Sequence, residues 1–442
     1  MLEDQSEAVR CAACAALGAF EASDCAGKLA SLLSDKSPEV QGAACLALGK
    51  LGEVGTRSAA DVAAKMQEPR SRLQAIHALG TMDKAGEGHC EAVVDCLEDQ
   101  DADIRLAAAQ LCGQMGKAMR ASEGSWAKLT SLLGNSDGNV RCATAMALGF
   151  MGKEAADLSD SLKDMLEDDF SETGVTALTV GGGRARVPPS ARKAKCAAAA
   201  ALGFIVESNA DVAVDVYAAE VANLVNDEDW EIRMVACEAL AMMGEAAREQ
   251  ATRVSSIFDD ERFAVRAKAA LASGKMKDTE AASGLADLTG DNCPSVREEA
   301  VLALAELGDD GAEYIEKVFE KVSDNSPSVR AAAMTALSRM GMKGQCYAGA
   351  VAARLMEYDA VFVRIAAIDA LGNMEEHGAA YAELVAESLE DQQPQVRAAA
   401  AAALGKMGPD GEAFGDVLKP LTKDPSSEVR KAASQAVSQL RI

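Results

Sequence analysis

Apolar residues recur along most of the chain at a spacing typical of short amphipathic helices, and the same group of helices repeats many times. The repeated pattern is an Asp, a Pro or Ser, then Val-Arg, then an Ala-rich helix that closes on Ala-Leu-Gly and Leu/Met-Gly. Clear copies start at Asp35, Asp324 and Asp391. The pattern predicts a chain built from one structural unit used many times.

The Arg of the Val-Arg pair, or the residue in its place, gives one anchor position for each copy. Thirteen anchors follow one another at intervals of 31 to 38 residues, with a single longer interval of 54. They are Arg10, Gln41, Arg72, Arg105, Arg141, Lys195, Arg233, Arg266, Arg297, Arg330, Arg364, Arg397 and Arg430. So many positions at nearly one period are not a chance result, and we predict thirteen repeats.

Each repeat has the pattern of two helices. A Pro three residues before the anchor suits the first turn of the second helix, where a missing N–H breaks no hydrogen bond. These prolines are Pro38, Pro69, Pro294, Pro327 and Pro394. The second helix then continues for about four turns to a Gly, a common C-terminal stop. The preceding amphipathic stretch, such as residues 58–67, predicts a first helix.

The pattern resembles HEAT repeats of the short type found in phycobilisome-lyase-like proteins, and the resemblance covers almost the whole chain. One helix pair buries too little apolar surface alone, whereas stacked pairs share a continuous core. The expected fold is therefore all-α, a right-handed α-α superhelix (a HEAT/armadillo-like solenoid). It should contain about twelve helix pairs and one orphan N-terminal helix, from Asp4 to Gly18.

In this family the turn Asp and the Arg six residues later form a hydrogen-bonded ladder between neighbouring repeats. The resemblance implies a structural role in such a ladder for Asp35, Asp99, Arg105, Asp227, Arg233, Asp260, Arg266, Asp291, Arg297, Asp324, Arg330, Asp391, Arg397, Asp424 and Arg430. Met66 and Pro189 stand at the Asp position of the third and sixth repeats, so we expect the ladder to be interrupted there.

The long interval holds about twenty extra residues, predicted as a loop because three consecutive glycines and two prolines oppose a helix. It divides the chain into residues 1–170 (repeats 1–5 and the first helix of repeat 6), 171–190 (the insertion) and 191–442 (repeats 6–13). Arg184 and Arg186 make the insertion locally basic. Two interpretations stay open: a loop without a role, or an arm that binds a partner.

The chain begins almost at a second helix and ends within one. Neither end shows the polar capping repeat that a free solenoid needs. We therefore expect that the chain is a fragment, or that a partner covers its ends.

The charge of the chain limits its partners. The formal net charge is −25, which repels phosphate backbones and anionic lipid headgroups and attracts basic proteins. No apolar run is long enough for a transmembrane helix. Hydrophobic residues make up 49% of the chain but aromatic residues only 4%, which favours closely packed helices over an α/β enzyme or a β-sandwich.

The residues that could carry chemistry have simpler explanations. None of the three histidines is followed by Glu, which excludes the iron site of the HEAT-fold enzyme deoxyhypusine hydroxylase, and no HExxH motif occurs. Cysteines fall at repeat positions that other copies fill with small or apolar residues, as at Cys14, Cys45 and Cys237. Reduced thiols indicate an intracellular, reducing compartment, with the cytoplasm expected and an organelle open. We expect no catalytic residue, cofactor or metal.

The second helices of HEAT arrays line the concave side. Residues one and five after the anchor face away from the buried stripe, and few of them are charged. The candidate partner-binding residues among them are Leu46, Leu73, His77, Leu106, Gln110, Met146, Met234, Leu302 and Ile365. Either these side chains pack between repeats, or they form a groove for a partner's helix or extended segment, in which Gly at the eighth position would admit its backbone.

The leading hypothesis is a non-enzymatic scaffold or adaptor that binds a protein partner along the solenoid. The partner would be basic or would present an apolar helix; nucleic acid and direct membrane insertion are not expected. The alternatives are a structural subunit of a large cytoskeletal or photosynthetic assembly, and a bilin-lyase-like subunit that assists an enzyme.

Overall fold

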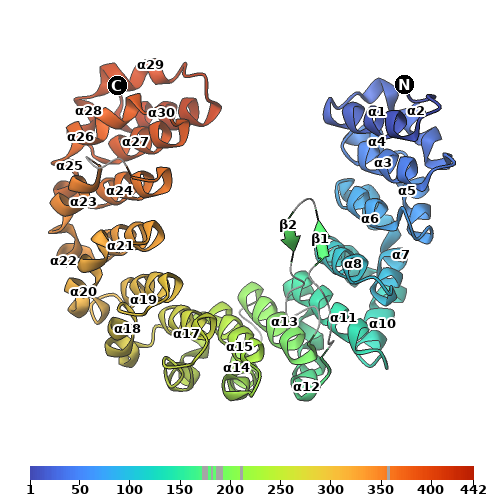
Figure 1. Cartoon of the computed structure of the whole chain (residues 1–442), viewed down its shortest axis with the longest axis horizontal. Helices are drawn as coiled ribbons and strands as arrows, with labels where there is room; N and C mark the ends of the chain where they lie inside the picture. Colours follow the sequence, from blue (N-terminus) through green and yellow to red (C-terminus); the bar gives the residue numbers. More distant parts are fainter. Residues whose placement is uncertain (172–177, 181–182, 186–192, 210–212, 356–358) are drawn as a thin grey trace. The chain divides into compact units, whose positions relative to one another are not determined.

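The computed structural model describes residues 1–171, 178–180, 183–185, 193–209, 213–355 and 359–442. The chain folds as two compact units, residues 1–243 and 244–442. Most of the described residues are helical (Figure 1), and the prediction of an all-α fold is confirmed. No helix in this described part is both long and apolar enough to cross a membrane.

In the first unit the second helices form one row, each packed against the next. They are α1 (Glu7–Ala19), α3 (Pro38–Gly49), α6 (Arg72–Gly80), α8 (Ala102–Gln114), α11 (Gly138–Met151), α13 (Ala194–Ser208) and α15 (Trp230–Met243). The first helices form the row behind them: α2 (Ala26–Ser31), α5 (Ala59–Ala64), α7 (Cys90–Asp95), α10 (Glu123–Leu132), α12 (Ser159–Asp164) and α14 (Val214–Asn223). Shorter helices α4 (Glu53–Thr56) and α9 (Gly116–Ala121) connect the rows.

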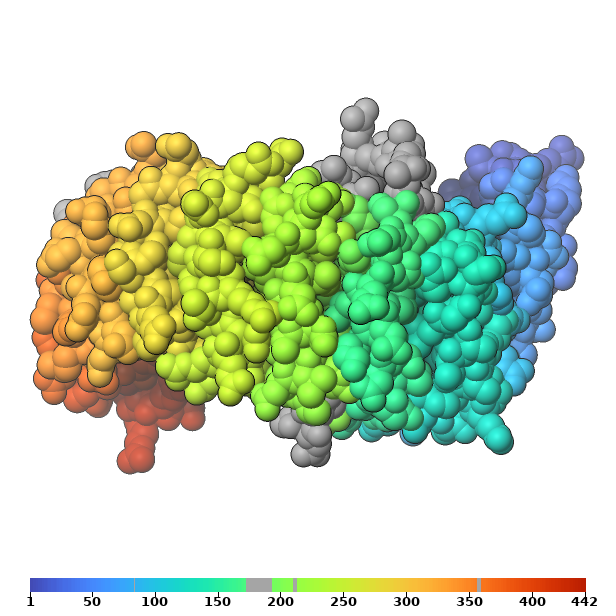
Figure 2. Space-filling model, turned by 90° about the horizontal axis from the view of Figure 1, so that it is seen from below, coloured from blue at the N-terminus to red at the C-terminus, as the bar shows by residue number. Residues whose placement is uncertain are grey.

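The second unit repeats this arrangement. Its second helices are α17 (Phe263–Lys275), α19 (Pro294–Glu306), α21 (Pro327–Arg339), α24 (Val361–Asn373), α27 (Pro394–Lys406) and α30 (Ser427–Leu440). Its first helices are α16 (Ala251–Ser255), α18 (Ala282–Leu288), α20 (Ile315–Glu320), α23 (Ala348–Leu355), α26 (Ala382–Glu387) and α29 (Gly415–Leu421), with connecting helices α22 (Gly341–Gln345), α25 (Glu375–Ala379) and α28 (Pro409–Glu412). Within each unit, Figure 2 shows successive repeats as adjoining bands of colour.

Proline begins four of the second helices, as predicted: Pro38, Pro294, Pro327 and Pro394. The same prediction for Pro69 is wrong, because α6 begins only at Arg72. In the preceding repeat, the Asp35 carboxylate accepts the Ser37 N–H at 2.9 Å and fixes the turn before the helix. Met66 cannot accept the equivalent bond, and the Glu68 N–H donates to the Lys65 carbonyl instead.

The buried stripe of each second helix is apolar, as the helical wheel predicts. In the second unit, for example, Val296 and Leu304 of α19 and Val329 and Leu337 of α21 are completely buried. Val296, Leu304 and Leu337 belong to one continuous core of the unit, so neighbouring repeats stabilise one another.

The outermost helices differ from this pattern. Phe20 of the first repeat occupies a position that is buried in the other repeats, but its side chain is 83% exposed. In α30, every exposed position carries a polar or charged side chain: Ser427, Glu428, Arg430, Lys431, Ser434, Gln435, Ser438 and Gln439.

The two glycine positions near the end of many second helices have different roles. The later one adopts positive φ, between 56° and 62°, and turns the chain out of the helix at Gly52, Gly152, Gly244, Gly308, Gly341 and Gly408. The earlier one lies inside the helix at its contact with the next repeat. A Cβ at Gly274 would lie 2.8 Å from the Cα of Ala303, for example. The neighbouring helix therefore occupies the space that the sequence suggested for a partner's backbone.

The anchor arginines connect each repeat to the next. Arg297 donates to the Asp291 carbonyl of its own turn at 2.9 Å and, with two N–H groups, to the Asp324 carboxylate of the next repeat at 2.7 and 2.9 Å. The same double contact joins Arg10 to Asp35, Arg266 to Asp291, Arg330 to Asp359 and Arg397 to Asp424. Planar two-point pairing of this kind fixes orientation as well as distance.

The remaining ladder residues lie in the same turns. Arg105, Arg233 and Arg430 donate to the carbonyl oxygens of Asp99, Asp227 and Asp424 in their own turns, and Arg266 donates likewise to the Asp260 carbonyl. Arg364 contacts the Asp391 carboxylate at 2.9 Å, and the Arg397 guanidinium contacts the Asp391 carbonyl. Arg72 pairs with Asp99 although Met66 stands in its own turn.

Two carboxylates of the ladder were missed because they lie at a different spacing. Asp168 accepts from Arg141 at 2.7 Å, just before the insertion, and Pro189 lies outside the described residues. Asp359 lies five, not six, residues before its anchor Arg364. In both cases the three-dimensional turn is kept while the sequence interval changes.

The insertion leaves and rejoins the repeat at adjacent points. Ser171 and Lys193 form an isolated antiparallel bridge, and the Ala194 N–H donates to the Phe170 carbonyl at 3.0 Å. Between them, β1 (Leu178–Val180) and β2 (Gly183–Ala185) pair in antiparallel fashion, where a loop was predicted. The hairpin is thus inserted into a repeat in which the residues before and after the insertion remain in contact.

Candidate partner-binding site

The predicted partner-binding residues differ in how far they reach the surface. Leu46 is 38% exposed, and His77 and Gln110 are also exposed. Met146 is buried, and the rest are half-buried: Leu73, Leu106, Met234, Leu302 and Ile365. Most of this face is therefore accessible, and the structure gathers several of these residues around three hollows.

Four of them meet in one apolar hollow of the first unit. Leu106 and Gln110 of α8, Met146 of α11 and Met234 of α15 line a space of about 290 Å³. The hollow, here called the Met/Phe groove, is completed by Gly149, Phe150, Ala200, Ala201, Phe204, Val235, Glu238, Ala239 and Met242. Residues from four successive second helices thus form one surface, with Gln110 and Glu238 as its only polar side chains among the described residues.

Phe150, Phe204 and Met242 were missed by the sequence analysis. All three lie nine residues after an anchor, about 40° further round the helix than the fifth position. The rings of Phe150 and Phe204 lie 5.8 Å apart. Most other repeats carry a polar residue at this position: Lys50, Thr81, Gln114, Lys275, Glu306, Arg339, Asn373, Lys406 and Gln439. Comparing this position between repeats would have located the groove.

A second hollow of the first unit is more polar. Leu46, His77 and Gln110 line a space of about 280 Å³ together with Lys50 and Gln114. Leu73 does not reach it. This surface continues from the Met/Phe groove through Gln110, which lines both hollows.

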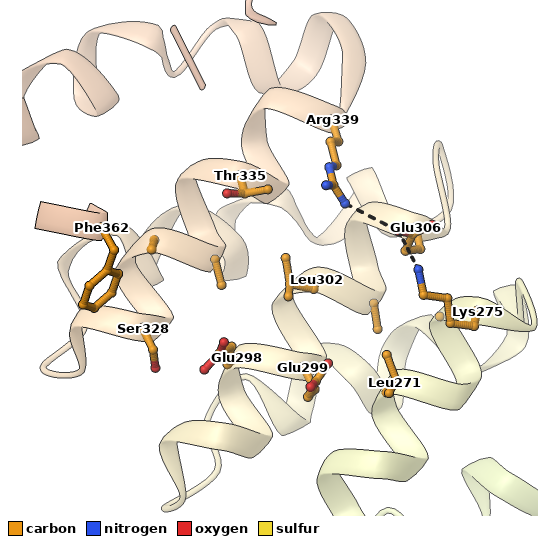
Figure 3. A pocket seen from close by; sticks show the side chains of 14 residues that line it. Leu271, Lys275, Glu298, Glu299, Leu302, Glu306, Ser328, Thr335, Arg339 and Phe362 are labelled. Atoms are coloured by element: carbon orange, nitrogen blue, oxygen red, sulfur yellow. Dashed lines mark hydrogen bonds and ion pairs between the residues drawn. The ribbon is translucent and has the colours of Figure 1, made fainter. Parts of the chain in front are cut away.

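Leu302 lies in a third hollow, in the second unit (Figure 3). The space is about 370 Å³ and is here called the Glu298 hollow. Leu271 of α17 and Leu302 of α19 supply apolar contacts, and Phe362 of α24, 51% exposed, stands at one side. The other lining residues are Gly274, Lys275, Glu298, Glu299, Ala303, Glu306, Ser328, Ala331, Ala332, Thr335 and Arg339. Ile365 does not line it.

Charge is unevenly distributed in the Glu298 hollow. At one end Glu306 pairs with Lys275 at 3.4 Å and Arg339 at 3.5 Å, and Lys277 also contacts it at 2.9 Å. The hydrogen bond from Lys277 holds the pKa of Glu306 below its ordinary value. Elsewhere in the hollow, burial raises the pKa of Glu299.

The basic insertion offers less to describe. Arg184 lies in β2 opposite Thr179, and Arg186 lies outside the described residues. The interpretation of this segment as a partner-binding arm stays a prediction.

The side chains that could react or bind metal are dispersed. No group of three or more His, Cys, Asp or Glu residues in the described part of the chain could hold a metal ion. Burial raises the pKa of Cys14 and Cys96 to about 11 and that of Cys45 to about 12, which keeps these thiols protonated at neutral pH.

Solved structures with the same fold include importins. Yeast importin-beta (Kap95p) aligns with 94% of the chain at 13% sequence identity, with a TM-score of 0.61. Importin beta crystallised from polyethylene glycol aligns with 93% of the chain at 13% sequence identity, with a TM-score of 0.60. The karyopherin Kap121p, bound to the extreme C-terminus of the protein phosphatase Cdc14p, aligns with 93% of the chain at 14% sequence identity, with a TM-score of 0.53. The chain covers 62%, 64% and 51% of these proteins. At such identities the likeness concerns the fold alone.

Sequence comparison gives the family. A search of curated protein sequences found no match. A family model described as HEAT repeats matches residues 1–80, 90–177, 251–317, 284–355 and 350–438, and a single HEAT repeat matches residues 220–247. These matches do not distinguish the phycobilisome-lyase type from other HEAT repeats. They cover most of the chain, and together with the stacked helix pairs they show that it belongs to the HEAT-repeat family.

Proposed function

We propose that this chain is a non-enzymatic scaffold that holds a protein partner against its second-helix face. The observation that carries the proposal is the Met/Phe groove, where three successive repeats replace the usual polar residue by Phe150, Phe204 and Met242. Helix packing alone does not require this change, because polar residues occupy the position in most other repeats. A local apolar surface fits an apolar ligand segment.

The composition of the groove favours a helix or an extended segment with bulky apolar side chains. Three methionines and two phenylalanines supply contacts that adapt to different side-chain shapes. Among the solved relatives, Kap121p holds a C-terminal protein segment on a solenoid of the same fold, which supports the general mode of binding. With a net charge of −25, the chain attracts basic partners most strongly.

Affinity purification of wild-type chain and of the double variant Phe150→Gln/Phe204→Gln tests the proposal. Gln occurs naturally at this position in Gln114 and Gln439, so the variant should fold. We expect a stoichiometric protein with the wild type and a loss of about tenfold or more with the variant. Val216→Gln, at a 48% exposed site on α14, is the matched control and should leave binding unchanged.

If both variants retain the same proteins, the Met/Phe groove does not bind the partner. A lyase-like function makes a different prediction, namely a bound chromophore or metal. Visible absorption and metal analysis of natively purified protein distinguish the two, and we expect neither signal.

A further inference from the structure

We propose that the Glu298 hollow of the second unit accepts a lysine or arginine side chain from a basic segment of the partner. The inference rests on the proposed scaffold function and defines the chemistry of one contact. It concerns residues 271–362 only and is independent of the Met/Phe groove.

The shape of the hollow suits a long side chain with an apolar stem. Leu271 and Leu302 line its middle, and Phe362 stands at its outer side with half of its surface exposed (Figure 3). Lysine and arginine lay their methylene groups on apolar surfaces of this kind and keep the charged end near polar groups. An aromatic ring beside a cation adds attraction.

The charged side chains of the hollow favour a positively charged ligand. Lys275 and Arg339 line the hollow but are paired with Glu306 at its far end. Glu298 and Glu299 form no hydrogen bond or ion pair within the described part of the chain. The two carboxylates without an ion pair therefore lie apart from the cations around Glu306 (Figure 3), and they would repel an anionic segment.

Partial burial of the Glu299 carboxylate favours the binding of a cation. The half-buried carboxylate is partly removed from water, which raises its pKa, and the positive charges of Lys268 and Lys275 only partly oppose this effect. A purely apolar ligand would bury both carboxylates further without a partner, which is unfavourable. A cation would compensate them, so the same pocket that disfavours an apolar ligand favours a basic one.

A random peptide library displayed on phage and selected against the full chain provides an unbiased probe. We expect enriched sequences with Lys or Arg next to an aliphatic or aromatic residue. Synthetic fluorescent copies of these peptides should bind the double variant Glu298→Gln/Glu299→Gln about tenfold more weakly than wild type. The matched control Glu383→Gln/Glu387→Gln, on the exposed side of α26, should bind within about twofold of wild type.

Thermal unfolding of both double variants shows whether they are folded. Equal binding to Glu298→Gln/Glu299→Gln and wild type, or enrichment of acidic peptides, would overturn the inference. If peptides bind but lose affinity only with Phe150→Gln/Phe204→Gln, the scaffold function stands and the basic pocket fails. If no peptide is enriched against the full chain, the result contradicts both.

Discussion

Pairs of Arg and Asp side chains connect neighbouring repeats. The Arg297 guanidinium contacts a carbonyl in its own turn and a carboxylate in the next, and the Asp324 carboxylate also accepts the Ser326 N–H at 2.8 Å. The Arg297 and Asp324 side chains are only 13% and 9% exposed. Such a pair orients one helix against another, and loss of one partner leaves the other charge without compensation.

The substitution Asp324→Asn tests this role. It removes the charge but keeps the size, so the free energy of unfolding should fall by about 1–3 kcal/mol. Urea unfolding followed by circular dichroism measures the change. Asp309→Asn, at an exposed position, serves as the control and should change stability by less than about 0.5 kcal/mol. Equal effects of the two substitutions would show that the ladder does not stabilise the fold.

The ladder also predicts how stability depends on pH. Hydrogen bonds from Arg10 and Arg330 hold the pKa of Asp35 and Asp359 below the ordinary value of 3.8. These carboxylates contribute stability above that value, and the contribution is lost as the pH falls through it. Urea midpoints should therefore decrease steeply on acidification below about pH 4, and less steeply in Asp359→Asn. An identical slope in this variant would contradict the assignment.

At the level of elements, spacing along the sequence predicted most of the fold but not every boundary. The anchors were found because most repeats carry an Arg at this position, and only Gln41 and Lys195 depart from it. The start of α6 was wrong because the turn before it depends on the side chain at position 66, where Met replaces Asp. Asp168 and Asp359 were missed because an insertion or a one-residue shift changes the interval and leaves the contact intact.

Close helix packing makes a prediction about the earlier glycine. In Gly274→Ala the new Cβ would lie 2.8 Å from both the Cα and the Cβ of Ala303, so α17 and α19 must move apart. We expect a loss of about 1–3 kcal/mol in the free energy of unfolding. Gly27→Ala on α2 is the control, since no atom lies within 4 Å of its new Cβ, and it should gain up to about 1 kcal/mol. A neutral Gly274→Ala would contradict this packing.

The candidate site was only partly predictable for a related reason. A helical wheel applied equally to every repeat identified Leu106, Gln110 and Met146 on one face. It did not show which repeats are special, because that information lies in differences between repeats, as at Phe150 and Phe204. Which neighbouring side chains enclose a hollow also depends on packing between helices, which the sequence pattern does not specify.

For the whole molecule, the two units present different surfaces to a partner. The first carries an apolar groove, and the second carries a hollow with carboxylates beside Leu302 and Phe362. An overall charge of −25 increases the rate of encounter with basic proteins, while the hollows determine which segment is held. Together these features support the proposal of a scaffold that recognises a basic segment with bulky apolar residues.

Site-specific photo-cross-linking tests this account most directly. A photoreactive phenylalanine analogue is placed at Gln110, which lines both hollows of the first unit, or at Val216 on the opposite row. The account predicts a defined protein adduct from position 110, absent from position 216 and lost in the background of Phe150→Gln/Phe204→Gln. Adducts of equal yield at both positions, or none at position 110, would contradict it.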